Sequence, residues 1–477
     1  MPAKSGKVTT AALRASRPQA RAVASARAGT RVDPEGLLAM APLRAIVRLA
    51  TPTMVVMCVA ATSNVLFTYY VSRLGAEAIA AVSLVFPISL LAIAAMAGGV
   101  GAGAASAVAR ALGAQRRRDA AAVAEHALVL SVGIGLAFAL GILAGAPALF
   151  RLMGAHGAVL HLAVGFARVL FGGAAITFVG GMFDSVMRGE GNVRVPAIWA
   201  STSLVLQIAL IPLFMFVAGW GLVGAALAVL ASQLLATLAR ARYVLGGRGV
   251  VQPSFWPRAF GFTPLVEILR VGVPASLSTM VNNVGMMVLT GVLAHLGEAH
   301  LAAYGLGVRL DFLLLSFAYG FGAAVLTLVG LATGAHRTDR TVAYVKGAGV
   351  MMVTLLAVPG LLLWWQPALW FGIFTDDAGI RAVGAHYFRF IGPSYPFIGI
   401  SMVMGFALQG LGRATAPLMW MAVRVVGVLS AALICTQWLG LADRAVFVAI
   451  AAGNVLSAGV MFLLFRRAHR AMRRTAV

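Results

Sequence analysis

The chain repeats itself inside long apolar segments, and this repeat limits its possible folds more than any other feature. The run RGEGNVRVP (188–196) returns as QGLGRATAP (409–417), with both glycines and the proline in step. The run RLGAEAIAAVSLV (73–85) returns as HLGEAHLAAYGLG (295–307), at an offset one position longer. Arg168 and Arg389 share the first offset, and Pro52 and Pro274 share the second. A doubled membrane bundle is typical of carriers whose halves rock about a central site, so the repeat predicts a transporter.

The composition fits only a membrane protein of the helical class. Hydrophobic residues make up 61% of the 477 residues and charged residues 11%. A soluble chain of this length needs far more polar surface. The 54 glycines suit close helix packing in lipid. Long apolar runs, rather than short alternating segments, favour helices over a β-barrel.

Twelve apolar runs are long enough to cross a bilayer, six in each half. We predict spans near 46–71, 78–104, 123–146, 159–186, 195–218, 222–245, 266–293, 300–330, 342–363, 382–408, 416–438 and 444–465. An even number of spans per half gives both halves the same orientation. The expected fold is therefore all-α, with twelve transmembrane helices in two six-helix lobes related by a pseudo-two-fold along the membrane normal.

The basic residues lie in the connections and predict the topology. With the N-terminus inside, the inner connections and C-terminal tail carry nineteen basic residues and the outer connections carry four. This bias follows the positive-inside rule and places both termini in the cytoplasm. It also explains the net charge of +23 without a nucleic-acid partner. We expect an integral protein of the plasma membrane, which is the inner membrane of a bacterium.

The spans and charges divide the chain into five parts. Residues 1–43 are predicted to be a disordered basic cytoplasmic tail, although an Arg-rich, acid-poor stretch also resembles a transit peptide. Residues 44–245 form the predicted N-lobe and 246–265 a cytoplasmic inter-lobe linker. Residues 266–465 form the predicted C-lobe, and 466–477 a second basic cytoplasmic tail.

The motifs of several enzyme classes do not occur in the sequence. No GxxxxGK[ST] phosphate loop, HExxH zinc motif or nucleophile–base cluster is visible. Cys58 and Cys435 lie far apart in apolar runs, and the eight histidines lack ligand spacing. We therefore predict a protein that is not an enzyme, has no cofactor or bound metal, and uses an ion gradient.

Two acidic residues within the predicted spans are candidates for binding a coupling cation. Asp311 lies about 17 Å into the eighth span and is the only carboxylate so close to the midplane. A structural ion pair with an arginine of another span is the alternative. Asp184 lies at the inner end of the fourth span, one turn before Arg188, and this spacing allows a local Asp–Arg pair.

Other polar residues within the spans are candidates to line a cavity. Three arginines lie in spans four, ten and eleven: Arg168, Arg389 and Arg424. In one interpretation they line a cavity, and in the other they donate hydrogen bonds to backbone carbonyls of neighbouring helices. Asparagines in spans one and seven bind a ligand or simply join helices: Asn64, Asn282 and Asn283.

The motifs together resemble the MATE (multidrug and toxic compound extrusion) family over residues 44–465. The similar runs are RLGAEAIAAVSLVFP (73–87), RGEGNVRVP (188–196), AYGLGVRLDFLLLSFAYGFGAAVLTLVG (303–330) and LQGLGRATAP (408–417). The resemblance implies two lobes around a central cavity and export of amphipathic, often cationic organic compounds. It also implies exchange for Na⁺ or H⁺ as coupling ion.

The resemblance assigns expected roles to individual positions. Pro52 matches the proline associated with bending of the first helix, Asn64 matches a common asparagine there, and Asp311 matches an acidic position in the eighth helix. Phe67, before Thr68, stands where many relatives have an acidic residue, and it is a further candidate to line the cavity. The resemblance therefore leaves three alternatives. Asp184 replaces the missing acidic residue, the coupling ion binds at Asp311 in the second lobe, or the substrate differs from that of the relatives.

Two other functions remain possible on the sequence alone. One is a flippase or exporter of lipid-linked or anionic compounds from the same superfamily, because buried arginines exceed buried acids. The other is a passive channel or a structural membrane subunit. In the leading interpretation the partners are a small organic substrate and membrane lipid, and the protein is a monomer.

Overall fold

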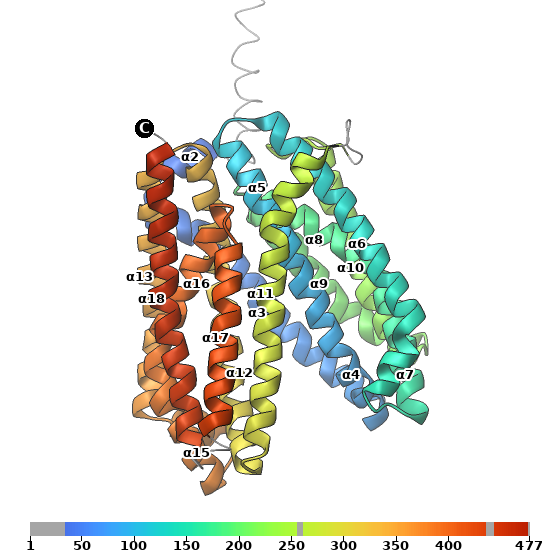
Figure 1. The fold of residues 1–477 in the computed structure, drawn as a ribbon. Helices are drawn as coiled ribbons and strands as arrows, with labels where there is room; N and C mark the ends of the chain where they lie inside the picture. The colour runs from blue at the N-terminus through green and yellow to red at the C-terminus, as the bar shows by residue number, and fades with distance from the viewer. Residues whose placement is uncertain (1–33, 255–260, 436–442, 476–477) are drawn as a thin grey trace, which may run out of the picture.

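The computed structural model describes residues 34–254, 261–435 and 443–475, which form a bundle of helices without strands in these ranges (Figure 1). The first half contains α2 (Pro34–Ala39), α3 (Pro42–Ser72), α4 (Ala76–Ile93), the π-helix η1 (Ala94–Val100), α5 (Gly101–Gly113), α6 (Arg117–Leu152), α7 (Gly157–Gly172), α8 (Ala174–Gly189), α9 (Arg194–Pro212), the π-helix η2 (Leu213–Val217) and α10 (Gly221–Leu245). The second half contains α11 (Phe262–Ala294), α12 (Glu298–Gly334), α13 (Thr338–Trp365), α14 (Ala368–Phe374), α15 (Ala378–Ile391), the 3₁₀-helix η3 (Gly392–Ser394), α16 (Tyr395–Gly410), α17 (Thr415–Leu433) and α18 (Asp443–Thr475).

The helices confirm the predicted membrane class. Within the described residues, eleven helical segments are long and apolar enough to span a membrane, and the pair α7 and α8, bent by 45°, makes a twelfth. Each segment overlaps one of the predicted spans. The expected all-α fold with twelve spans is therefore confirmed.

The two lobes meet through a pair of equivalent hydrogen bonds. The Ser106 hydroxyl of α5 donates to the Gln409 carbonyl at 2.6 Å, and the Thr327 hydroxyl of α12 donates to the Arg188 carbonyl at 3.1 Å. Ser106 and Thr327 are separated by the same offset as Arg188 and Gln409. Each bond is therefore the image of the other under the repeat, as a two-fold relation between the lobes requires.

Close backbone packing follows the same symmetry. A Cβ added to Gly113 would collide with the Leu331 carbonyl oxygen, and one added to Gly334 would collide with the Arg110 carbonyl oxygen. Gly113 and Gly334 are repeat equivalents, as are Arg110 and Leu331. Only glycine lets two helices approach so closely. Both copies of the repeat therefore keep a close backbone contact between the lobes.

The π-helix η1 explains why the repeat changes offset. The longer offset holds up to Val85 and the shorter one from Ser106 onward, so the first half has one extra residue between these positions. A π-helical turn accommodates one additional residue within a helix. In this interval the first half has η1 (Ala94–Val100), whereas α12 is α-helical throughout. The extra residue is thus absorbed without breaking the span.

The lobes pack at one end of the bundle and diverge toward the other (Figure 1). We call the first of these the terminal end, because α2 and the C-terminal turns of α18 lie there, and the second the distal end. In α5, at the terminal end, Ala104 and Ala107 are fully buried. Near the distal end of α3, Val65 and Tyr69 are 69% and 50% exposed. The inter-lobe hydrogen bonds and glycine contacts described above lie at the terminal end.

The connection between the lobes is held on the first lobe by two buried glutamates. Glu190, which follows α8, accepts the backbone N–H groups of Val250 and Val251 at 3.2 and 2.9 Å. Glu125 of α6 accepts both the N–H and the hydroxyl of Ser254 at 2.9 Å. The predicted linker, 246–265, is therefore fastened along part of its length, and α11 begins at Phe262, before the predicted end of the linker. Residues 255–260 of this linker lie outside the described residues.

Part of the predicted disordered N-terminal tail is ordered. Residues 1–33 lie outside the described residues, but 34–39 form α2 and α3 begins at Pro42. The side chains of Leu37 and Leu38 are buried, and the Tyr344 hydroxyl donates to the Leu37 carbonyl at 3.1 Å. The expectation of disorder up to residue 43 is wrong for this part, because two leucines bury against the second lobe.

The buried Glu190 predicts a pH-dependent stability. Burial raises the pKa of its carboxyl from 4.5 to about 7, against the two N–H groups that lower it. A raised folded-state pKa contributes stability below pH 4.5 that is lost as the pH rises through about 7, on the order of 3 kcal/mol. We expect Glu190→Gln to remove this loss, measured as a smaller fall in apparent Tm between pH 4.5 and pH 8 in detergent. Glu77→Gln, at an exposed position, is the matched control, and equal falls for all three proteins would contradict the prediction.

Candidate functional site

A cavity of about 340 Å³ lies in the second lobe, a volume typical of small-molecule sites. Its walls come from α11, α12 and α15–α18, and Gly98 of η1 contributes from the first lobe. The apolar part of the lining includes Leu289, Phe312, Met402, Phe406 and Met421. The polar part includes Thr279, Asn282, Asp311, Ser401, Arg424 and Asn454. This mixture suits an amphipathic organic molecule.

The carboxylate of Asp311 lies in this cavity between two tyrosines. Its Oδ2 accepts a hydrogen bond from the Tyr387 hydroxyl at 2.8 Å, and its Oδ1 accepts a short one from the Tyr395 hydroxyl. The Tyr304 ring packs edge-on against Tyr387, with centroids 6.2 Å apart. Among the described residues, Asp311 is the only carboxylate that lines the cavity, and two hydroxyl donors satisfy its oxygens. The arrangement stabilises one negative charge in a largely apolar environment.

The local sequence explains how the two tyrosines reach one carboxylate. The 3₁₀-helix η3 joins α15, which carries Tyr387, to α16, which begins at Tyr395. Gly307 of α12 lets Tyr387 approach, since an added Cβ would lie 2.5 Å from the tyrosine ring. The same helix carries Asp311 one turn further on. Close approach of α12 to α15 therefore creates the acidic site.

A second polar network lies deeper in the lobe. The Arg424 guanidinium of α17 donates to the Asn454 side-chain carbonyl of α18 at 2.7 Å. The Asn454 amide donates in turn to the Ser394 hydroxyl of η3 at 2.9 Å. No described carboxylate forms an ion pair with Arg424. The cavity thus contains one positive and one negative side chain that do not pair with each other. Arg424 bonds to Asn454, and Asp311 bonds to the two tyrosines.

The first lobe does not repeat the acidic site. The repeat places apolar or small residues at the positions equivalent to Asp311, Tyr387 and Tyr395: Ser89, Phe166 and Ala174. Phe166 packs against Phe67, with ring centroids 6.3 Å apart. Phe67 therefore occupies an aromatic contact where the family resemblance led us to look for an acidic residue. The two lobes share a fold but not this chemistry.

Asp184 forms an ion pair with Arg240, and not with Arg188, which the i,i+4 spacing had suggested. Its Oδ1 lies 2.8 Å from Nε of Arg240 in α10, and both side chains are nearly buried. Arg188 is not the partner. The repeat equivalents of Asp184 and Arg240 are Gly405 and Met461, which line the cavity of the second lobe. The ion pair therefore fills space in the first lobe where the second lobe is hollow.

The remaining predicted residues divide into two groups. Asn282 and Arg424 line the cavity, and their contact with a substrate stays a prediction. Four others are exposed and outside its lining: Asn64, Arg168, Asn283 and Arg389. Pro52 lies inside α3, which is one continuous helix from Pro42 to Ser72. Their proposed roles in cavity lining and helix bending stay predictions.

Sequence reasoning missed Tyr387, Tyr395 and Asn454. A tyrosine in an apolar span is ordinary in sequence, so neither phenol stood out. The Gly392–Pro393 pair that separates the tyrosines is the available signal, because it interrupts the tenth span close to its midplane. An interrupted span is a recognised sign of a binding site in transporters.

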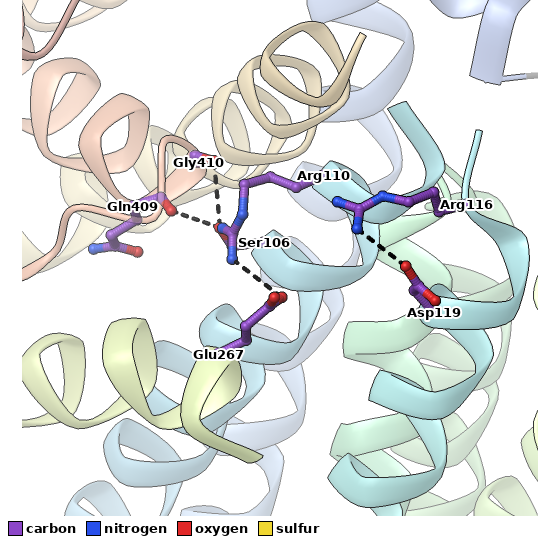
Figure 2. Close-up of polar contacts among 7 residues, drawn as sticks. All are labelled: Ser106, Arg110, Arg116, Asp119, Glu267, Gln409 and Gly410. Atoms are coloured by element: carbon purple, nitrogen blue, oxygen red, sulfur yellow. Dashed lines mark hydrogen bonds and ion pairs between the residues drawn. The ribbon is translucent and has the colours of Figure 1, made fainter. Parts of the chain in front are cut away.

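Polar contacts close the terminal end between the lobes (Figure 2). The Arg110 guanidinium of α5 donates to the Ser106 hydroxyl and lies 4.0 Å from the Glu267 carboxylate of α11. Ser106 in turn contacts the Gln409 and Gly410 carbonyls of α16. We call this set, together with Thr327, Arg188, Gly113 and Gly334, the terminal gate. The nearby pair of Arg116 and Asp119 lies within the first lobe on an exposed surface and does not join the lobes.

Comparison with known proteins gives a consistent result. A family model described as MatE matches residues 52–213 and 274–436. The probable multidrug resistance protein YpnP of Bacillus subtilis is 26% identical over 292 residues, which are 61% of this chain and 64% of that protein. The FAD transporter of Shewanella oneidensis is 26% identical over 407 residues, 83% of this chain and 88% of that protein.

A solved structure extends the similarity to nearly the whole chain. The crystal structure described as MATE in the bent conformation is 30% identical, with a TM-score of 0.88. The match covers 94% of this chain and 99% of that one. The chain thus spans just under two thirds of YpnP but almost all of this structure.

The terminal gate predicts that one added methyl group prevents closure. Gly334→Ala places its Cβ against the Arg110 carbonyl and Gly113→Ala against the Leu331 carbonyl, so both should open the terminal end. The measurement is the distance between two spin labels, attached through Arg116→Cys and Arg337→Cys in a variant without native cysteines. We expect this distance to lengthen in both alanine variants. Gly141→Ala, where an added Cβ meets nothing within 4 Å, should leave it unchanged.

Loss of either inter-lobe hydrogen bond should open the terminal gate less than the alanine substitutions do, and by a similar amount for each bond. Ser106→Ala and Thr327→Val each remove the hydroxyl that donates across the lobes, and loss of that inter-lobe bond is worth roughly 1 kcal/mol or about fivefold in the population of the open gate. The same label pair measures both. Equal distance distributions in the native and doubly substituted proteins would show that these bonds do not hold the gate.

Proposed function

This chain belongs to the MATE family, and from that membership we propose that it is a secondary active antiporter of amphipathic organic compounds. It exports them across the inner membrane of a bacterium by alternating access, in exchange for H⁺ or Na⁺. The observation that carries the proposal is the carboxylate of Asp311 in the cavity of the second lobe. One relative described above is named an FAD transporter and the other a probable multidrug resistance protein, which supports a carrier rather than an enzyme.

We assign coupling to Asp311 rather than to Asp184. Asp184 is already neutralised by Arg240, which supports a structural role. Asp311 has no cationic partner among the described residues, only two phenol hydroxyls. A proton requires one carboxylate, whereas a metal cation is held by several oxygen ligands. Because no second described carboxylate lines the cavity, the geometry favours H⁺, and Na⁺ is the alternative that the experiment separates.

The cargo binds in the same cavity under this proposal. A cationic amphipathic compound would place its charge near Asp311 and its rings against Phe312, Phe406 and Tyr304. Protonation of Asp311 then removes the negative charge that attracts the cargo. The coupling cation and the cargo thus compete for the negative charge of Asp311, and binding of one disfavours binding of the other. This competition gives exchange without a second binding site. The partners are the cargo and membrane lipid, and the carrier acts as a monomer.

A second candidate cargo is an anionic metabolite. The Arg424 guanidinium lines the cavity and has a neutral amide partner, so an anionic group could bind it. The relative with broad coverage that is named an FAD transporter favours the same chemistry. Arg424→Gln separates the candidates, because it should weaken transport of an anion and spare that of a cation.

The proposed orientation places the terminal end in the cytoplasm. The nineteen basic residues of the inner connections and tail support it through the positive-inside rule. The terminal gate is closed in this structure and the lobes diverge at the distal end. In this orientation the state is open to the outside. Release of cargo would then precede opening of the terminal gate.

Coupling at Asp311 predicts the loss of ion-driven efflux in Asp311→Asn. Removing the titratable charge should reduce efflux from proteoliposomes by at least tenfold, because exchange needs a group that gains and loses a cation. Imposed H⁺ and Na⁺ gradients are tested separately, against a panel of cationic and anionic compounds. Tyr387→Phe, which keeps the ring and removes one donor, should retain part of the activity.

The control for this experiment is a surface carboxylate. Asp119→Asn changes the same charge at an exposed pair and should leave efflux unchanged. Full gradient-driven efflux by a well-folded Asp311→Asn protein would refute coupling at this residue. Flux that never exceeds the substrate gradient would instead favour a passive channel.

The orientation predicts opposite labelling at the two ends. In a variant without native cysteines, Asp376→Cys at the distal end should react with a membrane-impermeant thiol reagent in intact cells. Arg248→Cys, exposed in the linker at the terminal end, should react only after the membrane is opened. The reverse pattern would place the terminal end outside.

A further inference from the structure

A second hollow lies on the outer face of the second lobe, away from the transport cavity. It is a groove of about 770 Å³ between α13, α16 and α18, which lie together at one edge of the bundle (Figure 1). Its walls are mainly aliphatic and aromatic: Val342, Val345, Val350, Val353, Ile400, Met404, Phe462 and Phe465. Because the groove lies on a lobe face that the other lobe does not cover, membrane lipid borders it.

Three cations line this otherwise apolar groove. Lys346 of α13 and Arg466 and Arg470 of α18 are all exposed there. None of them forms an ion pair with a described carboxylate. The Arg466 guanidinium lies over the Phe462 ring at 5.7 Å, which holds it beside the groove. Charge complementarity therefore requires an anionic occupant.

The cations lie at the depth of lipid headgroups. Lys346 is about 12 Å along α13 from the terminal end, and about 30 Å from the opposite end of that helix. Arg466 is about 34 Å along α18 from its distal start. A hydrocarbon core is about 30 Å thick, so all three charges fall at its boundary on the terminal side. The apolar walls extend from this boundary toward the midplane.

The first lobe fills the equivalent place with its own chain. The repeat equivalent of Lys346 is Glu125, which accepts two hydrogen bonds from Ser254 of the linker. The equivalents of His469 and Arg470 are Arg248 and Gly249, where the linker has already left α10 and turned back. Val251 is buried by this turn. The second lobe instead continues as a helix and reverses the charge from Glu125 to Lys346.

The N-terminal residues of the sequence have the wrong charge to cover this groove. The residues ahead of α2 carry seven basic side chains against one acidic: Lys4, Lys7, Arg14, Arg17, Arg21, Arg27 and Arg31, with Asp33. Like charges would repel that segment from Lys346 and the two arginines. An anion from outside the chain is the better match.

We propose that this groove is a binding site for an anionic phospholipid of the leaflet at the terminal end. The phosphate lies between Lys346, Arg466 and Arg470, and one acyl chain lies along Val350, Val353 and Phe462. The site takes the place that the linker occupies in the first lobe, and lipid thereby fastens α18 to α13. A zwitterionic lipid lacks the net charge to compensate three cations.

Native mass spectrometry of the full-length delipidated protein tests this site. The protein is titrated with phosphatidylglycerol or with phosphatidylcholine of the same acyl chains. We expect a preference for phosphatidylglycerol in the native protein. Each removed charge should weaken its binding about fivefold, so the pair Lys346→Gln and Arg470→Gln should weaken it by more than tenfold.

Two further variants keep the test decisive. Gly349→Leu fills the groove without changing charge, and an added Cβ there meets nothing within 4 Å, so this variant should fold and lose the lipid. The pair Arg116→Gln and Arg337→Gln changes the same net charge at the same end outside the groove, and should bind as the native protein does. Equal binding of the two lipids by the native protein, or undiminished binding by both groove variants, would overturn the proposal. Binding of glycerol phosphate equal to that of the lipid would overturn it too, by showing an ion site without an acyl chain.

Discussion

The structure depends on the close backbone contact between α5 and α12 at the pseudo-two-fold. Gly113 faces the Leu331 carbonyl and Gly334 faces the Arg110 carbonyl, and neither contact leaves room for a Cβ. Ala109 and Gly330, which are repeat equivalents, meet each other and mark the axis itself. In lipid, such contacts gain from packing and weak Cα–H···O bonds, because no hydrophobic effect drives helices together. A small and dry contact can separate and re-form as a unit.

The terminal gate is built largely from equivalent residues of both lobes, whereas the site around Asp311 is present in the second lobe alone. The hydrogen bonds and glycine contacts of the gate come from equivalent residues of both lobes, whereas the Arg110–Glu267 pair is asymmetric because the repeat equivalent of Arg110 is Leu331. The second lobe alone carries the carboxylate with two phenols, while the first replaces them by Ser89, Phe166 and Ala174. The ion pair of Asp184 and Arg240 fills the place that Gly405 and Met461 leave open. The second lobe thus contains the cavity that Asp311 lines, whereas the first lobe fills the equivalent place with an ion pair.

The fold was predictable because it rests on long-range patterns, and much of the site was not. Twelve apolar runs and a repeat at a nearly constant offset give the spans and their relation, whatever the side chains contact. Asp311 was identifiable since a charge near the midplane is costly and rare. Its tyrosine partners were not, because they come from another span and look like ordinary aromatic residues. The partner of Asp184 was missed for the same reason: i,i+4 spacing indicates Arg188, but Arg240 from α10 reaches it. The order of α2 depends on a surface of α13 that no local pattern reveals.

The termini of the two lobes show how a duplicated chain becomes asymmetric at its edges. At the end of the first lobe the chain must cross to the second, so it leaves α10 at Leu245 and packs back on Glu125 and Glu190. In the second lobe, α18 instead continues as a helix to Thr475 and carries its arginines along the groove between α13 and α16. Glu190 satisfies two backbone N–H groups and Glu125 satisfies one, which a loop would otherwise leave without partners. These hydrogen bonds attach the linker to the first lobe, and the groove lies within the second lobe, whereas the contacts of the terminal gate join the two lobes.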